Sequence, residues 1–389
     1  MHIKTLLFVA ALLGAIGTAP LQASSICCAG PVITIADDIR ASDVVITAVL
    51  VQRIAAPEDD PRYGDCLFDV LSVVKGKQYL AGLPQVDGAT RITLKFFGEQ
   101  PLGSKVFACA IDPLDLAWGS PTVMKESGIE YVTRLPSLPA SGAERLAFFY
   151  GRLGDEDPIV AADGNDELSR LDDATLRMLK PHLRHDDVVR SIQDKSQTVA
   201  RRRLFMRLLA VCGTADDLPL LEAMIREENR ETVKGLDATI ATYLTLRGPA
   251  GMPLVEELFL KNPAAQYTEI YSAITALRNL RDYSEAVPRE RLLEGFRALL
   301  ENPVLADLVV ADLAKAQDWE SMDRLVKLFK EADEDSMWVR VPVVHFLRLC
   351  PLPEAKKHLE ELTKIDPEAV AKSMRQFQPP ANNPATIVQ

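Results

Sequence analysis

The densest cluster of histidine and acidic residues along the sequence is His182-Leu-Arg-His185-Asp186-Asp187. Two histidines three residues apart can share one face of a helix, and neighbouring carboxylates could complete the ligand set of a metal ion. Pro181 and the charged surroundings favour a different interpretation, an exposed helix start at which Asp186 and Asp187 stabilise the positive end of the helix dipole. We expect this second arrangement, and therefore no metal ligands here.

Two acidic runs, Asp-Glu-Asp at 155–157 and Asp-Gly-Asn-Asp-Glu at 163–167, superficially resemble calcium-binding loops. An EF-hand loop needs ligands at positions 1, 3 and 5 and glycine at position 6. Gly164 instead follows the first aspartate directly. We expect no calcium site and no other cofactor.

Catalytic motifs are missing from the sequence. There is no Gly-x-Ser-x-Gly elbow, P-loop, Gly-x-Gly-x-x-Gly or His-Glu-x-x-His motif. After residue 23 the histidines are His182, His185, His345 and His358, and His345 falls on the apolar face of a helix predicted at 341–350. We therefore predict no catalytic residues and a non-enzymatic protein. The alternative is an envelope enzyme or metalloprotein with its site near His182 and His185.

Four of the six cysteines lie in the first 109 residues: Cys27, Cys28, Cys66 and Cys109. In an oxidising compartment one or two disulfides are expected among them. Adjacent cysteines rarely pair with each other, so we expect Cys27 and Cys28 to reach Cys66 or Cys109. A zinc site is the alternative, but zinc needs four ligands and no histidine follows His2 in this region.

Three further groups of residues have structural interpretations. Arg201–Arg203 fan around a predicted helix instead of converging on an anion, which predicts a solvent-exposed face. Cys212 and Cys350 each end a predicted helix and are expected in the core. The tryptophans could line a ligand groove, but we expect them to pack between structural units; they are Trp118, Trp319 and Trp338.

The composition is that of a folded soluble protein. The chain has 389 residues, 48% of them hydrophobic, and a formal charge of −11 at pH 7. This negative charge disfavours nucleic acid or an anionic membrane surface as the main partner.

Residues 1–23 resemble a secretory signal peptide, with Lys4, an apolar run from Leu6 to Ile16, and a cleavage site at Leu21-Gln22-Ala23. The run is shorter than the roughly 18 residues that a membrane span needs. An uncleaved anchor is the alternative. We expect a mature protein without a membrane span, exported to the periplasm, cell envelope or medium.

Residues 25–135 are predicted to form a small β domain. A short helix is expected at Thr34–Ser42. A loop and a second short helix, at Glu126–Leu135, are expected at the end of the domain. Runs rich in Val, Ile, Thr and Phe between these helices predict four strands, at Asp43–Gln52, Cys66–Val74, Thr90–Phe97 and Lys105–Asp112.

This domain resembles the netrin-like, tissue-inhibitor-of-metalloproteinases type of OB barrel. The resemblance rests on Cys27 and Cys28 near the mature start, on the helix that leads into the first strand, and on the run from Phe68 to Lys75-Gly76. It implies a barrel fold and, as a further alternative, protease inhibition through a free N-terminal cysteine. Cleavage after Ala23 would leave three residues before Cys27, which does not fit such an inhibitor.

From residue 143 to 377 the periodicity predicts helical hairpins. The stretch Arg201–Ile225 contains two amphipathic helices joined by a turn, with Gly213 expected in a left-handed conformation at the end of the first. Asp217-Leu-Pro-Leu-Leu-Glu222 recurs as Gly251-Met-Pro-Leu-Val-Glu256, a shift of 34 residues. Such a period, with a proline near the start of each second helix, resembles HEAT-type repeats and predicts an α-α solenoid. We expect a linker at 136–142 and a disordered tail at 378–389.

The fold class expected is therefore mainly α and multidomain: a small OB- or netrin-like β domain followed by a HEAT-like solenoid. The whole layout resembles a group of secreted planctomycete-type bacterial proteins, a resemblance that implies no particular activity. We expect an exported scaffold that binds a protein partner along the solenoid.

Overall fold

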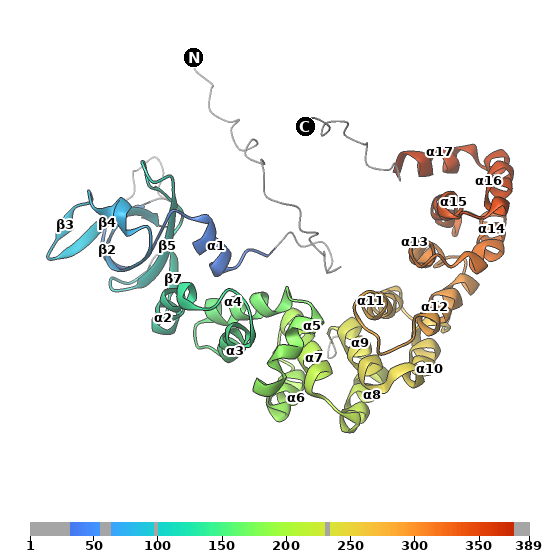
Figure 1. Ribbon diagram of the computed structural model, residues 1–389, viewed down its shortest axis with the longest axis horizontal. Helices are drawn as coiled ribbons and strands as arrows, with labels where there is room; N and C mark the ends of the chain where they lie inside the picture. The colour runs from blue at the N-terminus through green and yellow to red at the C-terminus, as the bar shows by residue number, and fades with distance from the viewer. Residues whose placement is uncertain (1–31, 55–63, 97–99, 230–233, 377–389) are drawn as a thin grey trace, which may run out of the picture. The chain divides into compact units, whose positions relative to one another are not determined.

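The structure is a computed structural model that describes residues 32–54, 64–96, 100–229 and 234–376. The chain divides into two units, Met1–Val32 and Ile33–Gln389, and every element described below belongs to the second. It is a mainly α-helical protein with a small antiparallel β domain near its N-terminal end (Figure 1). The predicted signal peptide, the tail, Cys27 and Cys28 lie outside the described residues.

Helix α1 (Ile35–Ala41) precedes the sheet, as predicted. Its start is fixed by a capping box, in which the Thr34 hydroxyl accepts the N–H of Asp37 and the Asp37 carboxylate accepts the N–H of Thr34.

The β domain is one seven-stranded antiparallel sheet in the order β3-β4-β2-β1-β5-β6, with β7 also paired to β5. The four predicted strands are present. They are β1 (Val44–Arg53), β2 (Gly64–Lys75), β4 (Ala89–Phe96) and β5 (Lys105–Ile111). Three strands of two or three residues were not predicted, because runs this short show no alternation: β3 (Gln85–Val86), β6 (Ala117–Trp118) and β7 (Thr122–Met124).

The two faces of the sheet belong to two different cores. Side chains at alternate positions of β1 and β5, such as Ile46, Leu50 and Ala108, form a core within the sheet together with Phe68. The opposite face contributes Val45 and other side chains to a second core, which continues into the helices as far as Val370. The sheet and the first helices are therefore joined by buried apolar contacts.

Six helical segments follow the sheet before the regular array begins. They are α2 (Glu126–Arg134), α3 (Ala143–Arg152), α4 (Pro158–Ser169), α5 (Asp173–Leu176), and the 3₁₀ helices η2 (Leu135–Ser137) and η3 (Arg177–His182). η2 and an irregular stretch occupy the predicted linker.

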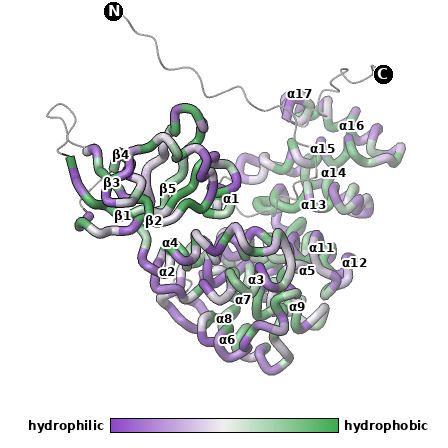
Figure 2. Tube along the Cα trace, turned by 60° about the vertical axis from the view of Figure 1, so that its left-hand side comes forward, coloured by the Kyte–Doolittle hydropathy of each residue, from purple (hydrophilic) through white to green (hydrophobic). Residues whose placement is uncertain are grey.

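The remaining helices alternate between two rows. We call the first the odd-numbered row; it comprises α7 (Val199–Cys212), α9 (Leu236–Arg247), α11 (Tyr267–Tyr283), α13 (Asp307–Ala316), α15 (Arg340–Leu349) and α17 (Pro367–Gln376). The even-numbered row comprises α6 (His185–Gln193), α8 (Leu218–Arg226), α10 (Met252–Val255) with the π-helical turn η6 (Glu256–Leu260), α12 (Arg289–Ala298), α14 (Met322–Glu331) and α16 (Pro353–Ile365). Hydrophobic and hydrophilic residues are interspersed along many of these helices, as expected of amphipathic helices (Figure 2).

The row pattern has the period that the sequence predicted. Odd-numbered helices from α7 to α15 end at residues 212, 247, 283, 316 and 349, at intervals of 33 to 36 residues. Pro219 and Pro253 each lie in the first turn of an even-numbered helix, where the missing N–H costs little. No helix in the described part of the chain is both long and apolar enough to span a membrane.

Gly213 is not in the left-handed conformation that we predicted. Its backbone is extended, with φ −73° and ψ 166°. The position requires glycine for space, because a Cβ atom would lie 2.6 Å from the carbonyl oxygen of Leu209 and 3.0 Å from Leu246. The lack of space beside the last turn of α7 and beside α9 therefore explains this glycine, and its backbone conformation does not.

Candidate functional site

An open cavity of about 450 Å³ lies where α6 faces the turn that joins α7 to α8. We call it the α6 cavity. It is lined by His185, Asp186, Val189, Arg190, Gln193, Asp216, Asp217 and Leu220. The turn is held by Thr214, which caps the 3₁₀ helix η4 (Ala215–Asp217) and whose N–H donates to Asp217 at 2.8 Å.

His185 and Asp217 form the central pair of this cavity. The Nε2 atom of His185 lies 2.8 and 3.0 Å from the two carboxylate oxygens of Asp217, and Nδ1 lies 3.4 Å from Asp186. The hydrogen bond to Asp217 raises the pKa of His185, against a smaller opposing effect of burial. Both ring nitrogens therefore face carboxylates.

In the part of the chain that the structure describes, no serine, threonine or cysteine side chain hydrogen-bonds to His185 as the nucleophile of a catalytic triad would. The nearby Cys212 thiol has a raised pKa, because it is partly buried and the charge of Asp217 opposes its ionisation. A protonated thiol is a poor nucleophile. A carboxylate on each side of His185 orients the ring and stabilises its charged form, but brings no hydroxyl or thiolate to be activated.

The two histidines that the sequence placed together do not share a helix face. His182 ends η3, the chain is extended at Leu183, and His185 begins α6. The expected helix start is confirmed, since Asp186 and Asp187 occupy the first turn of α6. Among the described residues, no three His, Cys, Asp or Glu side chains are placed to hold a metal ion.

The acidic run at 163–167 lies inside α4, and its carboxylates bind groups of the protein. Asp163 accepts the N–H of Ile35 at 2.7 Å and the hydroxyl of Tyr131, while Glu167 accepts the hydroxyl of Thr34 at 2.8 Å. Burial raises the pKa of Asp163. These buried bonds fasten the start of α1 to α4.

Carboxylates of the acidic run at 155–157 accept hydrogen bonds from backbone N–H groups. Asp157 is the N-cap of α4 and accepts the N–H of Ile159 at 2.9 Å. Asp155 accepts the N–H of Asp157 and the hydroxyl of Ser127. The calcium-like spacing thus has a structural explanation.

Cys66 and Cys109 are not bonded to each other, and no disulfide joins any of the cysteines that the structure describes. In the sheet, Cys66 lies opposite Arg53 and Cys109 opposite Val45, at the two ends of β1. At about 3.3 Å per residue this places them roughly 25 Å apart. Adjacent cysteines can bridge partners no more than about 17 Å apart. Cys27 and Cys28 therefore cannot bind Cys66 and Cys109 at the same time, and which pair forms stays a prediction.

The expectation that Arg201–Arg203 form a solvent-exposed face is wrong. Arg202 is buried, Arg201 donates to the carbonyl of Leu153, and Arg203 donates to Asp237 at 3.1 Å. Side chains this long can reach the neighbouring helices even when they leave the helix in different directions.

Arg203 belongs to a set of arginine–aspartate pairs that connect successive helix pairs. Each pair joins residues 34 positions apart, which is the repeat period. They are Arg203–Asp237, Arg207–Asp173 and Arg278–Asp312. These pairs were not predicted, although the opposite charges stand at the repeat interval in the sequence.

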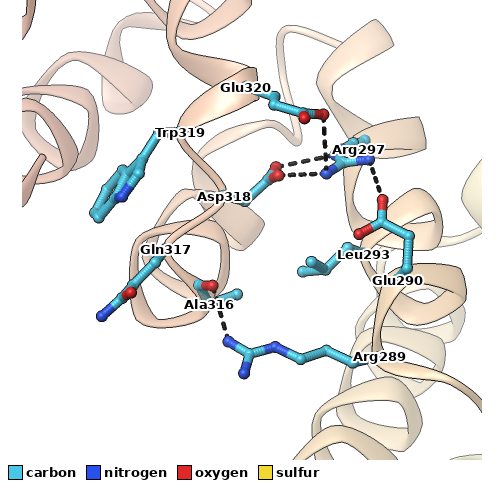
Figure 3. A pocket seen from close by; sticks show the side chains of 9 residues that line it. All are labelled: Arg289, Glu290, Leu293, Arg297, Ala316, Gln317, Asp318, Trp319 and Glu320. Atoms are coloured by element: carbon cyan, nitrogen blue, oxygen red, sulfur yellow. Dashed lines mark hydrogen bonds and ion pairs between the residues drawn. The ribbon is translucent and has the colours of Figure 1, made fainter. Parts of the chain in front are cut away.

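A second open cavity, of about 590 Å³, lies between α12 and the turn that follows α13 (Figure 3). We call it the α12 cavity. Arg297 donates to Asp318 through Nε and Nη2, and it also reaches Glu290 through Nη1 at 2.6 Å and Glu320 at 3.7 Å. The hydrogen bonds to Asp318 raise the pKa of Arg297. Arg289 donates to the carbonyl of Ala316 at 2.8 Å.

Trp319 lines the α12 cavity and also packs between units, as expected. Its ring meets that of Phe346 edge to face, with centroids 5.2 Å apart. The neighbouring Gln317 has a φ of 59°, an uncommon conformation for a residue with a side chain.

No protein-family model matches this chain. Comparison with curated proteins also finds no match. The function must therefore be argued from the residues themselves.

Proposed function

We propose that this chain is an exported, non-enzymatic repeat protein that binds a protein partner along its helical array. In this proposal the array is HEAT-like, and the β domain is a netrin-like or OB barrel that serves as a second interaction module or as an N-terminal cap. Residues 1–23 would direct export.

The observation that carries the proposal is the exposure of large aromatic side chains on the odd-numbered row. Tyr267 and Tyr271 stack on each other at the start of α11, with centroids 6.3 Å apart, and both are exposed. Trp338, in the 3₁₀ turn η9 (Met337–Val339) that leads into α15, is 65% exposed. Exposed tyrosine and tryptophan are typical of the energetic centres of protein interfaces. Both groups lie at the N-terminal ends of helices in one row.

A capture experiment from envelope extract tests this proposal. The double variant Tyr267→Ser/Tyr271→Ser should lose a partner that the unchanged protein retains. Tyr79→Ser, a change at a similarly exposed tyrosine in the 3₁₀ helix η1 (Lys77–Leu80) of the β domain, is the control and should keep it. Reproducible failure to recover any partner with the unchanged protein would count against the proposal.

The second candidate is an envelope enzyme or metalloprotein, favoured by the His185–Asp217 pair in its open cavity. Metal analysis of the purified protein separates it from the first. Stoichiometric zinc or calcium that is lost in the double variant His182→Ala/His185→Ala would support it. Protease inhibition by the β domain requires a mature N-terminus at Cys27 or Cys28, which N-terminal sequencing tests.

A further inference from the structure

The two cavities occupy equivalent positions in the repeat. Helices α6 and α12 begin at His185 and Arg289, and the turns that face them lead into α8 and α14. Five lining positions correspond at a constant interval of 104 residues, about three repeats. They are His185 with Arg289, Asp186 with Glu290, Val189 with Leu293, Gln193 with Arg297, and Asp216 with Glu320. The corresponding positions thus include one carboxylate on the helix, one on the turn and one aliphatic side chain in each cavity.

In the α12 cavity the chain supplies its own cation. The guanidinium of Arg297 lies between Glu290 and Glu320, as Figure 3 shows, and an ion pair joins it to each of them. Asp318 is the main partner of Arg297, and its counterpart at the interval of 104 residues is Thr214. The carboxylates that the two cavities have in common are those that add a further ion pair each to this guanidinium. The planar guanidinium reaches carboxylates on both sides at once because its donors point in several directions.

In the α6 cavity the equivalent of Arg297 is Gln193, which has no charge. The Asp216 carboxylate accepts no hydrogen bond from any residue that the structure describes. Asp186 is 92% exposed, and its side chain contacts just one charged group among the described residues, His185 at 3.4 Å. Arg190, the cation at the edge of this cavity, is paired with Asp187 at 3.0 Å. The two carboxylates therefore lack the guanidinium that their counterparts hold.

We propose that the α6 cavity binds an arginine side chain of the partner protein, with the guanidinium between Asp186 and Asp216 and the aliphatic stem against Val189. This rests on the proposed function, which supplies a protein partner. The charge of −11 favours a basic partner surface. Arginine fits better than lysine because one carboxylate lies on the helix and the other on the turn, and a planar fork with several donors can bind two carboxylates at once.

The probe for a direct test is N-acetylarginine amide, added to the full chain labelled with ¹³C-histidine. The signal of the His185 ring, assigned by its loss in His185→Gln, should shift and saturate at millimolar probe. N-acetylcitrulline amide has nearly the same shape without the charge and should produce no shift. An equal shift with citrulline would overturn the proposal.

The variant Gln193→Arg places a guanidinium of the chain itself in the α6 cavity, as Arg297 does in the α12 cavity, and leaves every carboxylate in place. Affinity for the probe should fall by at least about tenfold, as expected when the new side chain fills the site more than nine-tenths of the time. Gln376→Arg adds the same charge at the exposed end of α17 and should leave the affinity unchanged. Unchanged binding by Gln193→Arg, or an equal loss in Gln376→Arg, would refute the assignment. Circular dichroism checks that both variants are folded.

Capture from envelope extract separates this inference from the proposed function. A partner bound by the unchanged protein and lost by Gln193→Arg supports both. A partner bound equally by the two proteins overturns the cavity assignment and leaves the proposed function standing. If the probe binds but no partner is recovered, the proposed function fails instead.

Discussion

The carboxylate of Asp312 accepts more hydrogen bonds from a neighbouring helix pair than any other side chain that the structure describes. Its removal should destabilise the array at α11 and α13. Asp312 accepts three hydrogen bonds from Arg278, at 2.7 to 3.0 Å, and one from Arg281 at 2.7 Å. The side chains of Asp312 and Arg281 are each only 6% exposed. Burial lowers the pKa of Arg281, and hydrogen bonds to Asp282 and Asp312 more than offset this. The perturbation is Asp312→Asn, which keeps the shape and removes the charge.

The magnitude follows from what the two arginines retain. Breaking a buried ion pair by removing one partner costs about 3–5 kcal/mol, because a charge is left uncompensated. Arg281 keeps Asp282 as a partner, and Arg278 keeps the carbonyl of Leu308 and is partly exposed. We therefore expect the lower end of the range, about 3 kcal/mol.

Hydrogen exchange read by mass spectrometry is the suitable assay, because repeat arrays open locally and a single unfolding midpoint would average over them. Peptides from α11 and α13 should exchange faster in Asp312→Asn, while peptides from α7 should not change. The control is Asp173→Asn, which breaks a pair of the same 34-residue spacing whose aspartate is 45% exposed. This pair should contribute less than about 1 kcal/mol. Equal effects of the two substitutions would refute the argument that burial sets the cost.

Three further predictions follow from the α6 cavity, its turn and the sheet. The pKa of His185 is raised in the folded protein, so the stabilisation from its pairing with Asp217 is fully present below the unfolded pKa of about 6.5 and is lost as the pH rises through the folded value. The stability difference between the unchanged protein and His185→Gln should therefore shrink from pH 5.5 to pH 8.5 in urea unfolding, and Asp217→Asn should lower the His185 pKa measured by NMR. Gly213→Ala should cost about 1–3 kcal/mol through the clash with the Leu209 carbonyl, whereas Gly154→Ala, with open space around it, should be neutral in thermal unfolding. Peptide mapping of the unreduced exported protein should find no more than one of the two sheet cysteines bound to residue 27 or 28.

Much of this fold could be predicted from local patterns. The strands β1, β2, β4 and β5 are long enough to show β-branched runs, and helix starts such as Pro158 and Pro219 carry their own signals. The period of about 34 residues could be read from one recurring motif. Strands of two residues cannot be predicted from local patterns, because they form by pairing with the edge of a longer neighbouring strand.

The candidate site was predictable only in part. His185 was a candidate residue from the sequence, but its partner Asp217 lies 32 residues away, just below the repeat interval. Spacing along a single helix suggested His182 as the companion, and this failed because η3 ends at His182 and the chain is extended at Leu183 before α6 begins. Arg202 was taken for a surface residue for a similar reason, since exposure depends on neighbouring helices that one helix cannot reveal.

The repeat also explains how two equivalent cavities can differ in chemistry. Each of the turns that close them contains one buried acid, but Asp318 is the N-cap of its 3₁₀ turn η8 (Trp319–Ser321) whereas Asp217 is the last residue of η4. Each of these two buried acids binds a cationic side chain of the even-numbered helix that faces its turn. Asp318 takes Arg297 from the third turn of α12, and Asp217 takes His185 from the first turn of α6. The acid and its partner therefore occupy different positions on the turn and the helix in the two cavities, and position 193 of the α6 cavity is an uncharged glutamine, beside which we propose that a partner's arginine binds.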